Sequence, residues 1–281
     1  MAAEYPSTAR AALWHGAAMG DDADQLTDDG LRAALARPRY PRTARYDPRW
    51  VVDHWMGPHA LWLAEWLCEV MDLRPGMRVL DLGCGRAITS VFLAREFDVQ
   101  VVAADLWIAP TDNAATIAAA GCADRVVPLR AEAHDLPFAD GWFDAVVSID
   151  AYQYFGTDQL YLAYLSRFLR PGGRLGVVVP AVTAEVGDEP PEHLHAVWDP
   201  EFAAFHTPAW WRSLWTRSGR VDVEVADLLD DGAADWLAWA RACLAAGVRE
   251  EVRALVTNEV GLLEADAGRT LGFARVVARR R

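Results

Sequence analysis

The chain of 281 residues contains no lysine, so its 27 basic residues are all arginine. Acidic residues outnumber them at 40, which gives a formal net charge of −13. A protein that binds nucleic acid needs a basic face to meet the phosphate backbone. We therefore expect no nucleic acid among its partners.

Cysteine is also scarce. The four cysteines, which form no CxxC pair, are Cys68, Cys84, Cys122 and Cys243. Their spacing signals neither a zinc site nor a disulfide framework. No apolar run is long enough to span a membrane, and the first residues lack the basic and apolar stretches of a secretion signal. We expect a cytoplasmic globular protein, whose 53% hydrophobic residues can bury one substantial core.

The rest of the chain is organised around residues 78–88. A short apolar run at 79–82 predicts a buried strand, Gly83 and Gly85 break it, and apolar residues resume with a helical period from Ile88. A glycine turn at the carboxyl end of a strand lets the main chain approach a ligand, and the amides of the next helix face that ligand. In an open α/β sheet this crevice is the default binding site.

The residues around this turn restrict the ligand. A dinucleotide fingerprint requires a third glycine where this chain has Ile88, and the acidic Asp81 suits a cationic ligand better than a pyrophosphate. The sequence Val-Leu-Asp-Leu-Gly-Cys-Gly at 79–85 resembles motif I of the class I S-adenosylmethionine-dependent methyltransferases. Ala87 fills the third small position of that motif.

Two acidic positions further along the chain fit the same resemblance. Asp105 ends a second predicted strand, where a carboxylate accepts hydrogen bonds from the ribose hydroxyls of an adenosine cofactor, although the same geometry serves NAD. Leu106 and Trp107 follow, and we assign Trp107 to one face of the adenine. Residues 131–138 are similar to the family's motif III, which implies that Glu132 accepts from the adenine amino group and that the backbone of Ala133 contacts the ring edge.

A fourth motif, Phe-Asp-Ala-Val-Val-Ser at 143–148, resembles the family's motif IV. Ser148 and Asp150 follow its strand at the carboxyl end, where ligand-binding groups gather in such sheets, and we assign both to the cofactor site. The next residues, Tyr152, Gln153 and Tyr154, are candidate substrate contacts. Pro-Gly-Gly at 171–173 completes the series, which follows the family's order.

The resemblance implies an α/β fold: a seven-stranded, mostly parallel sheet of order 3-2-1-4-5-7-6, with strand 7 antiparallel and helices on both faces. It assigns 59–281 to the methyltransferase domain, 1–58 to an N-terminal lid and about 181–218 to a cap insertion after strand 5. A helical region at 233–265, broken near Gly247, is expected to cross back to the last strand. Candidate lid residues that would contact substrate are Tyr46, Trp55 and His59.

Histidines gather in the expected cap insertion. Because histidine titrates near neutral pH, His193 and His195 are candidate general bases, together with Tyr152. Two histidines one residue apart without a third ligand are a weak metal signal, so we predict no metal site. The 13 tryptophans include candidates for holding a flat or cationic acceptor by stacking or cation–π contact, although core packing explains most of them.

These motifs predict methyl transfer to a small-molecule acceptor, which attacks the sulfonium methyl of S-adenosylmethionine in line and leaves S-adenosylhomocysteine. Asp81 would hold the methionine ammonium, directly or through water, and residues 83–85 would let the backbone pass the cofactor. The protein would chiefly supply positioning in a closed, dry site. The alternatives are a nicotinamide-dependent oxidoreductase and a non-catalytic module that binds S-adenosylmethionine. The sequence does not name the acceptor or the atom methylated.

Overall fold

The computed structural model describes residues 26–281, and its centre is one seven-stranded sheet. In spatial order the strands are β3 (Val126–Arg130), β2 (Gln100–Asp105), β1 (Arg78–Leu82), β4 (Phe143–Ile149), β5 (Leu169–Val182), β7 (Leu271–Arg280) and β6 (Val221–Leu228). All neighbouring pairs from β3 to β5 are parallel, whereas β7 is antiparallel to both β5 and β6. The predicted order and the antiparallel strand are confirmed.

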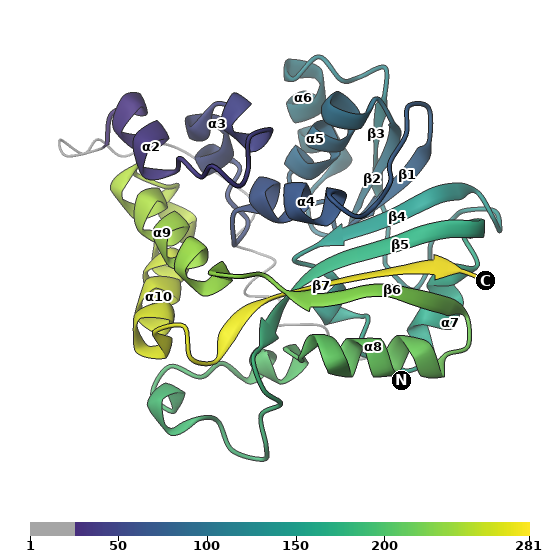
Figure 1. The fold of residues 1–281 in the computed structure, drawn as a ribbon. Helices are drawn as coiled ribbons and strands as arrows, with labels where there is room; N and C mark the ends of the chain where they lie inside the picture. Colours follow the sequence, from purple (N-terminus) through teal and green to yellow (C-terminus); the bar gives the residue numbers. More distant parts are fainter. Residues whose placement is uncertain (1–25) are drawn as a thin grey trace.

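Helices cover both faces of the sheet, which is why its central strands are almost entirely apolar. One face carries α4 (Ala60–Cys68), α5 (Ile88–Phe97) and α6 (Pro110–Ala119), and the other carries α7 (Tyr161–Ser166) and α8 (Pro208–Arg217) (Figure 1). Each interface is a buried hydrophobic cluster. None of the helices within 26–281 is long and apolar enough to cross a membrane.

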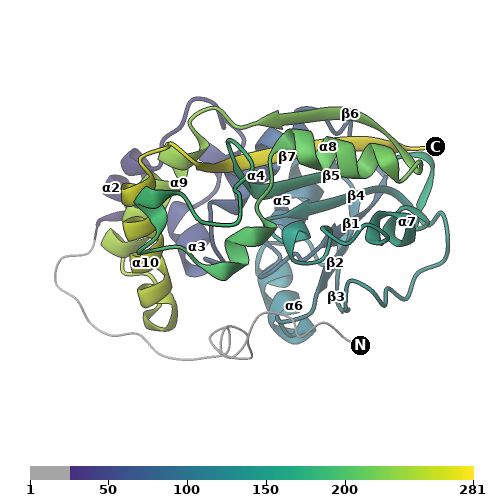
Figure 2. The same ribbon diagram turned by 90° about the horizontal axis from the view of Figure 1, so that it is seen from below.

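A group of helices lies beyond the carboxyl ends of the parallel strands (Figures 1 and 2). It consists of α2 (Asp28–Ala34), α3 (Pro48–Asp53), α9 (Gly232–Ala245) and α10 (Glu250–Asp266), with contacts from α2 to α3 and α9, and between α9 and α10. We call this group the helical cap. The helical region predicted at 233–265 therefore forms a large part of the cap, and the break near Gly247 is present.

The expected cap insertion at 181–218 needs a correction at both ends. Strand β5 continues to Val182, paired there with Leu271, and α8 packs against β6 and β7 as a layer of the core. The part outside the layers is 183–207, with two short 3-10 helices, η3 (Glu192–Leu194) and η4 (Pro200–Ala204), the first in contact with α10. Of the expected N-terminal lid, residues 1–25 lie outside the described residues.

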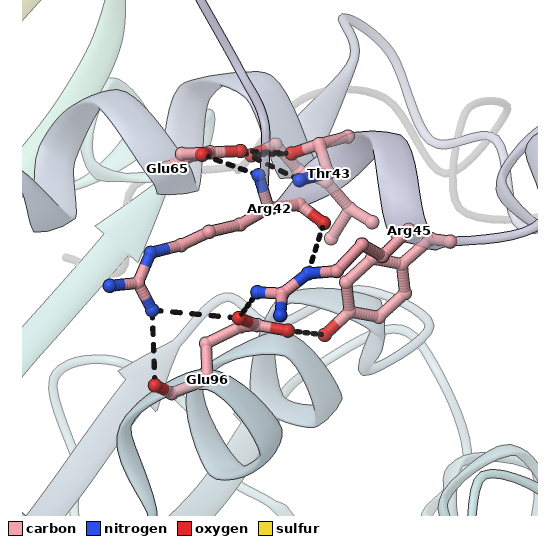
Figure 3. A network of polar contacts seen from close by, with 7 residues as sticks. Arg42, Thr43, Arg45, Glu65 and Glu96 are labelled. Atoms are coloured by element: carbon pink, nitrogen blue, oxygen red, sulfur yellow. Dashed lines mark hydrogen bonds and ion pairs between the residues drawn. The ribbon is translucent and has the colours of Figure 1, made fainter.

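Polar contacts fix the segment before α3 to the helices of the sheet (Figure 3). The carboxylate of Glu65, on α4, accepts hydrogen bonds from the amides of Arg42 and Thr43 at 2.8 and 2.7 Å, and from the Thr43 hydroxyl at 2.8 Å. Glu96, on α5, pairs with Arg45 and accepts from the Tyr46 hydroxyl at 3.2 Å. Since Glu65 is only 6% exposed, these bonds are shielded from water.

Replacing Glu65 by alanine tests this attachment. In Glu65→Ala the amides of Arg42 and Thr43 lose their acceptor, and a buried unsatisfied group costs about 1–3 kcal/mol. We expect the free energy of unfolding, measured in urea, to fall by about 3 kcal/mol. Glu69→Ala is the control: its half-exposed carboxylate pairs with Arg275 at 3.3 Å, and its loss should cost under about 1 kcal/mol. Equal losses in both variants would contradict the assignment.

Candidate active site

A cavity of about 690 Å³ lies between the sheet and the helical cap. This volume is within the range of about 300–1,000 Å³ that holds small-molecule ligands. One side, here named the sheet side, is formed by residues within 82–89, 104–107, 131–133 and 149–155, at the carboxyl ends of β1 to β4. The other, the cap side, is formed by residues within 51–60, 196–205, 236–239 and 255–262.

Most of the predicted binding residues line this cavity, and together the residues that line it are called the cavity wall. The predicted ones are Trp55, Gly83, Cys84, Gly85, Asp105, Leu106, Trp107, Glu132, Ala133, Asp150, Gln153 and Tyr154. They come from separate elements, and the parallel pairing of β1 with β2 and β4 aligns the strand ends that carry them.

The glycine turn after β1 has the conformation that its sequence predicts. Gly83 has φ +75°, and the amides of Gly83 and Cys84 both donate to the Ala104 carbonyl at 2.8 and 3.1 Å. A Cβ at position 83 would lie 2.4 Å from the Cβ of Ala151, so a side chain has no room there. The main chain itself therefore forms this part of the cavity wall.

Asp105 joins the glycine turn to the loop after β2. Its carboxylate accepts from the amide of Gly85 at 2.8 Å and from those of Trp107 and Ile108 at 2.8 and 2.9 Å. Burial raises the pKa of this carboxyl group above its ordinary value, while the three amides oppose the rise. An acidic group held in this way on the cavity wall suits a ligand with hydroxyl donors.

Glu132 and its neighbours form the next part of the sheet side. Glu132 accepts from the amide of His134 at 2.8 Å and lies 2.9 Å from its Nδ1. The Ala133 carbonyl accepts from the Tyr161 hydroxyl at 3.1 Å, which fixes the backbone there. The ring centroids of Trp107 and Tyr154 lie 5.9 Å apart, so aromatic surface flanks these polar groups.

Two predicted cofactor residues lie below the wall rather than on it. Asp81 is fully buried, and its Oδ2 accepts from the hydroxyls of Thr89 and Ser90, each at 2.6 Å. Ser148, also fully buried, donates to the Leu82 carbonyl at 2.7 Å. Both side chains support the glycine turn from within the core, and neither lines the cavity.

Three predicted substrate contacts are packing residues. Tyr46 donates to Glu96 and stacks on Trp50. His59 caps α4 by accepting from the Trp62 amide at 3.2 Å, and burial lowers its pKa to about 3. Tyr152 is fully buried in an aromatic cluster, where burial raises its pKa. The structure places none of the three on the cavity wall.

The predicted histidine bases also lie away from the cavity wall. Nε2 of His193 is 3.2 Å from Asp266 and 3.3 Å from the Thr270 hydroxyl, and Nε2 of His195 is 2.6 Å from the Pro190 carbonyl. His193 therefore joins the 183–207 segment to the end of α10, whereas His195 contacts its own segment. Within residues 26–281 no three histidine, cysteine or acidic side chains are grouped to hold a metal ion.

Most residues of the cap side were not predicted from the sequence. Its aromatic residues are Trp55, Trp198, Phe202, Phe205, Trp236 and Trp239, of which only Trp55 was expected at the site. Trp236 and Trp239 have helical spacing, which is equally typical of a core face. Two basic residues of the wall, His54 and Arg86, were also missed. The aromatic content of 196–205 was the one available signal for that segment.

Asp150 and Gln153 lie where the two sides meet. Asp150 follows β4 with φ +53°, and a Cβ at Gly57 would lie 2.7 Å from its Oδ2. The Gln153 amide nitrogen donates to the carbonyl of Asp150 at 3.1 Å and to its Oδ1 at 3.3 Å. The segment before α4 therefore contacts the carboxyl end of β4 directly.

Comparison with known proteins agrees with this geometry. Residues 79–173 match a family model described as a methyltransferase domain. Methyltransferase GfsG of Streptomyces halstedii is 32% identical over 45% of this chain and 46% of its own length. The 27-O-demethylrifamycin SV methyltransferase of Amycolatopsis mediterranei (strain S699) is 33% identical over 41% and 43%. The match thus spans less than half of these curated relatives.

Solved structures are similar over more of the chain. Geranyl diphosphate C-methyltransferase from Streptomyces coelicolor A3(2) superposes with a TM-score of 0.64 at 17% identity over 98% of both chains. The [4+2]-cyclase SpnF gives 0.64 at 19% over 78% of this chain and 80% of its own. Phosphoethanolamine N-methyltransferase 2 of Haemonchus contortus gives 0.64 at 19% over 89% of this chain and 60% of its own. At these identities the likeness shows the fold.

The buried Asp81 predicts a pH dependence of stability. Burial raises its pKa from 3.8 to about 6, against the hydrogen bonds from Ser90 and Thr89. Because the folded value is the higher one, the stabilisation is complete below about pH 4 and is lost as the pH rises through about 6. Asp81→Asn keeps the hydrogen-bond acceptor but not the titration.

We expect wild type to lose about 1 kcal/mol of unfolding free energy relative to Asp81→Asn between about pH 5 and about pH 7.5. Urea unfolding at both pH values measures the difference. Asp124→Asn, at an exposed position, is the control and should follow wild type. Parallel pH profiles for wild type and Asp81→Asn would show that Asp81 does not titrate in this range.

Proposed function

We propose that this chain is a class I S-adenosylmethionine-dependent methyltransferase acting on a small-molecule acceptor held in the cavity. The proposal rests on one observation. The amide of Gly85, in the glycine turn, donates to Asp105; both residues line the cavity, and both lie within the segment that matches a methyltransferase domain. The solved methyltransferases of the same fold include complexes with S-adenosylmethionine and S-adenosylhomocysteine.

The sheet side fits the adenosine half of this cofactor. Asp105 would accept from the ribose hydroxyls, since its carboxylate is fixed by backbone amides and lines the cavity. Glu132 would accept from the adenine amino group, with Ala133 at the ring edge and Trp107 over one face.

The methionine half would run along the glycine turn. Gly83 and Gly85 both line the cavity, and a side chain at position 83 would clash with Ala151. The guanidinium of Arg86, on the cavity wall beside this turn, is of the charge that a carboxylate requires. Asp81, below the turn, would act on the ammonium by its charge or through water.

S-adenosylmethionine supplies an electrophilic methyl group on a sulfonium. The cavity contributes position and exclusion of water, by holding the acceptor atom opposite the sulfur at the junction of the two sides. We assign the acceptor's environment to Asp150, Gln153 and Tyr154, which lie at this junction. The proton of a hydroxyl or amine acceptor would pass to solvent or to Asp150, because His193, His195 and Tyr152 lie away from the cavity wall.

The competing functions make different demands. A nicotinamide-dependent oxidoreductase would use the same ribose carboxylate, but Ile88 takes the place of the third glycine of its fingerprint. A non-catalytic module would keep the cofactor site and lack turnover. Because a cyclase shares the fold, binding and turnover must be measured separately.

Calorimetric titration with S-adenosylmethionine, S-adenosylhomocysteine and NAD decides among these functions. We expect micromolar binding of the two sulfur compounds and none of NAD, followed by acceptor-dependent release of S-adenosylhomocysteine. Binding of NAD alone would reject the methyltransferase. Tight binding of S-adenosylmethionine with no turnover on any acceptor would support the non-catalytic module.

Substitution of Asp105 tests the cofactor site. Asp105→Ala removes the ribose acceptor and the bond that holds the Gly85 amide, so the Kd for S-adenosylhomocysteine should rise about tenfold or more. Asp124→Ala, at an exposed position off the cavity, should leave that Kd unchanged. Circular dichroism of both variants is the check that they are folded. An unchanged Kd in folded Asp105→Ala would remove Asp105 from the ribose site.

A further inference from the structure

The turn after β4 carries two residues of the cavity wall. It is the 3-10 helix η2 (Tyr152–Tyr154), which the Gly156 amide closes by donating to the Tyr152 carbonyl at 2.7 Å. Tyr152 itself is buried in the core, whereas Gln153 and Tyr154 line the cavity. One short turn therefore connects the core to the cavity.

Core packing fixes the position of this turn. The Tyr152 ring is fully buried, and its centroid lies 5.7 Å from the ring centroids of both Trp211 and Trp215 on α8. A Cβ at Gly156 would lie 2.0 Å from Cε1 of the Tyr152 ring, so the chain after the turn packs directly against that ring. Gln153, the residue after Tyr152, is therefore held in place before any ligand binds.

Asp150 determines which way the side-chain amide of Gln153 faces. The amide nitrogen donates to the Asp150 carbonyl at 3.1 Å and to Asp150 Oδ1 at 3.3 Å. If the amide were turned over, its oxygen would face a backbone carbonyl, which cannot donate a hydrogen bond. The orientation with the nitrogen toward Asp150 is therefore the favourable one. It leaves the amide oxygen, Oε1, as the atom that Gln153 offers to other groups.

This oxygen is a buried hydrogen-bond acceptor that the protein does not satisfy. Gln153 is 2% exposed. Its Oε1 has no hydrogen-bond partner among the residues that the structure describes. A buried carbonyl oxygen without a donor is unfavourable, and native proteins leave few of them. Since Gln153 lines the cavity, a ligand bound there can supply the donor.

The residues just before η2 contact both sides of the cavity. Toward the sheet side, a Cβ at Gly83 would lie 2.4 Å from the Cβ of Ala151, so the chain before η2 abuts the glycine turn. Toward the cap side, a Cβ at Gly57 would lie 2.7 Å from Oδ2 of Asp150. Gln153 therefore lies close to both the glycine turn, along which the methionine half of the cofactor is proposed to run, and the cap. This is where the proposed function places the methyl acceptor.

We infer that Oε1 of Gln153 accepts a hydrogen bond from the methyl acceptor, which therefore carries a hydroxyl or N–H group. The inference rests on the proposed methyltransferase function and adds a chemical requirement for its second substrate. A molecule whose polar atoms only accept hydrogen bonds, such as an ether or an ester, would place another oxygen beside Oε1. The site would reject such a molecule, because a cavity built to pair with a donor leaves a buried oxygen unsatisfied when the donor is missing.

Two probes that differ in one group test the inference: 2-naphthol carries a hydroxyl where 2-methylnaphthalene carries a methyl group of similar size. Their shared ring system suits the aromatic side chains of the cap side. Each probe is titrated into protein saturated with S-adenosylhomocysteine, for wild type and for Gln153→Met. Methionine has the unbranched length of glutamine without its oxygen. The Kd of 2-naphthol divided by that of 2-methylnaphthalene should rise about fivefold or more in Gln153→Met.

Two further variants separate recognition of the probe from support of the fold. Gln153→Glu keeps an acceptor oxygen whether or not its carboxyl group is protonated, so it should keep a Kd ratio close to that of wild type. Gln159→Met, at an exposed position off the cavity in the segment before α7, is the matched control and should also keep that ratio. An equal rise of the ratio in Gln153→Glu and Gln153→Met would give Gln153 a purely structural role and overturn the inference.

The affinity for S-adenosylhomocysteine distinguishes the remaining outcomes. Its Kd should be unchanged in Gln153→Met, and a rise of about tenfold would assign Oε1 to the cofactor and overturn the inference. An unchanged probe ratio in Gln153→Met, or failure of 2-naphthol to bind wild type, would also overturn it. Failure of S-adenosylhomocysteine to bind wild type would instead reject the proposed function itself.

Discussion

The site depends on the attachment of the glycine turn to the end of β2. The Ala104 carbonyl accepts two amides of this turn, and the adjacent Asp105 carboxylate accepts a third, so consecutive residues of one strand fix the loop of its neighbour. This is possible because β1 and β2 are parallel and in register, with Leu82 beside Ala104. The bonds hold the turn in a left-handed conformation and determine where α5 begins.

The helical cap obeys a different constraint, since it is assembled from segments far apart in the sequence. Glu65 and Glu96 hold the residues before α3, while α9 and α10 arrive from between β6 and β7. The two parts meet where Trp239 donates to Gly57 and Arg249 donates to the Trp55 carbonyl. The cavity wall is therefore continuous only when both parts are docked. A substitution that disturbs the packing of either part would change the shape of the cavity.

Local patterns were sufficient to predict the sheet and its binding edge. Strand and turn chemistry at 79–85, and the carboxylate at the end of the next strand, depend on neighbouring residues, so a sequence reveals them directly. Asp81 shows where this fails. Its position in the motif indicated an action on the ligand directly or through water, and the sequence did not show that the hydroxyls of Thr89 and Ser90, in the first turn of α5, hold its carboxylate in the core.

Some predicted aromatic and histidine residues, such as His59 and Tyr152, lie off the cavity wall for a related reason. His59 and Tyr152 have the chemistry of site residues, and only their tertiary surroundings make one a helix cap and the other a core ring. Trp236 and Trp239 show the reverse, because their helical spacing is typical of a packed face and does not indicate that the face borders a cavity. The residue type gives the functional group of a side chain. Its position relative to the cavity depends on contacts with residues far apart in the sequence.

The difference in construction between the sheet side and the cap side explains how one fold can bind different small molecules. The sheet side is built from local motifs that strand pairing fixes, so a change there would disturb the sheet itself. The cap side consists of helices and the 183–207 segment, whose exposed residues can change without disturbing the sheet. Solved structures with this fold are named as methyltransferases of substrates as different as geranyl diphosphate and phosphoethanolamine. In this chain the cap side carries aromatic rings and carboxylates, whereas the sheet side carries the glycine turn and Asp105.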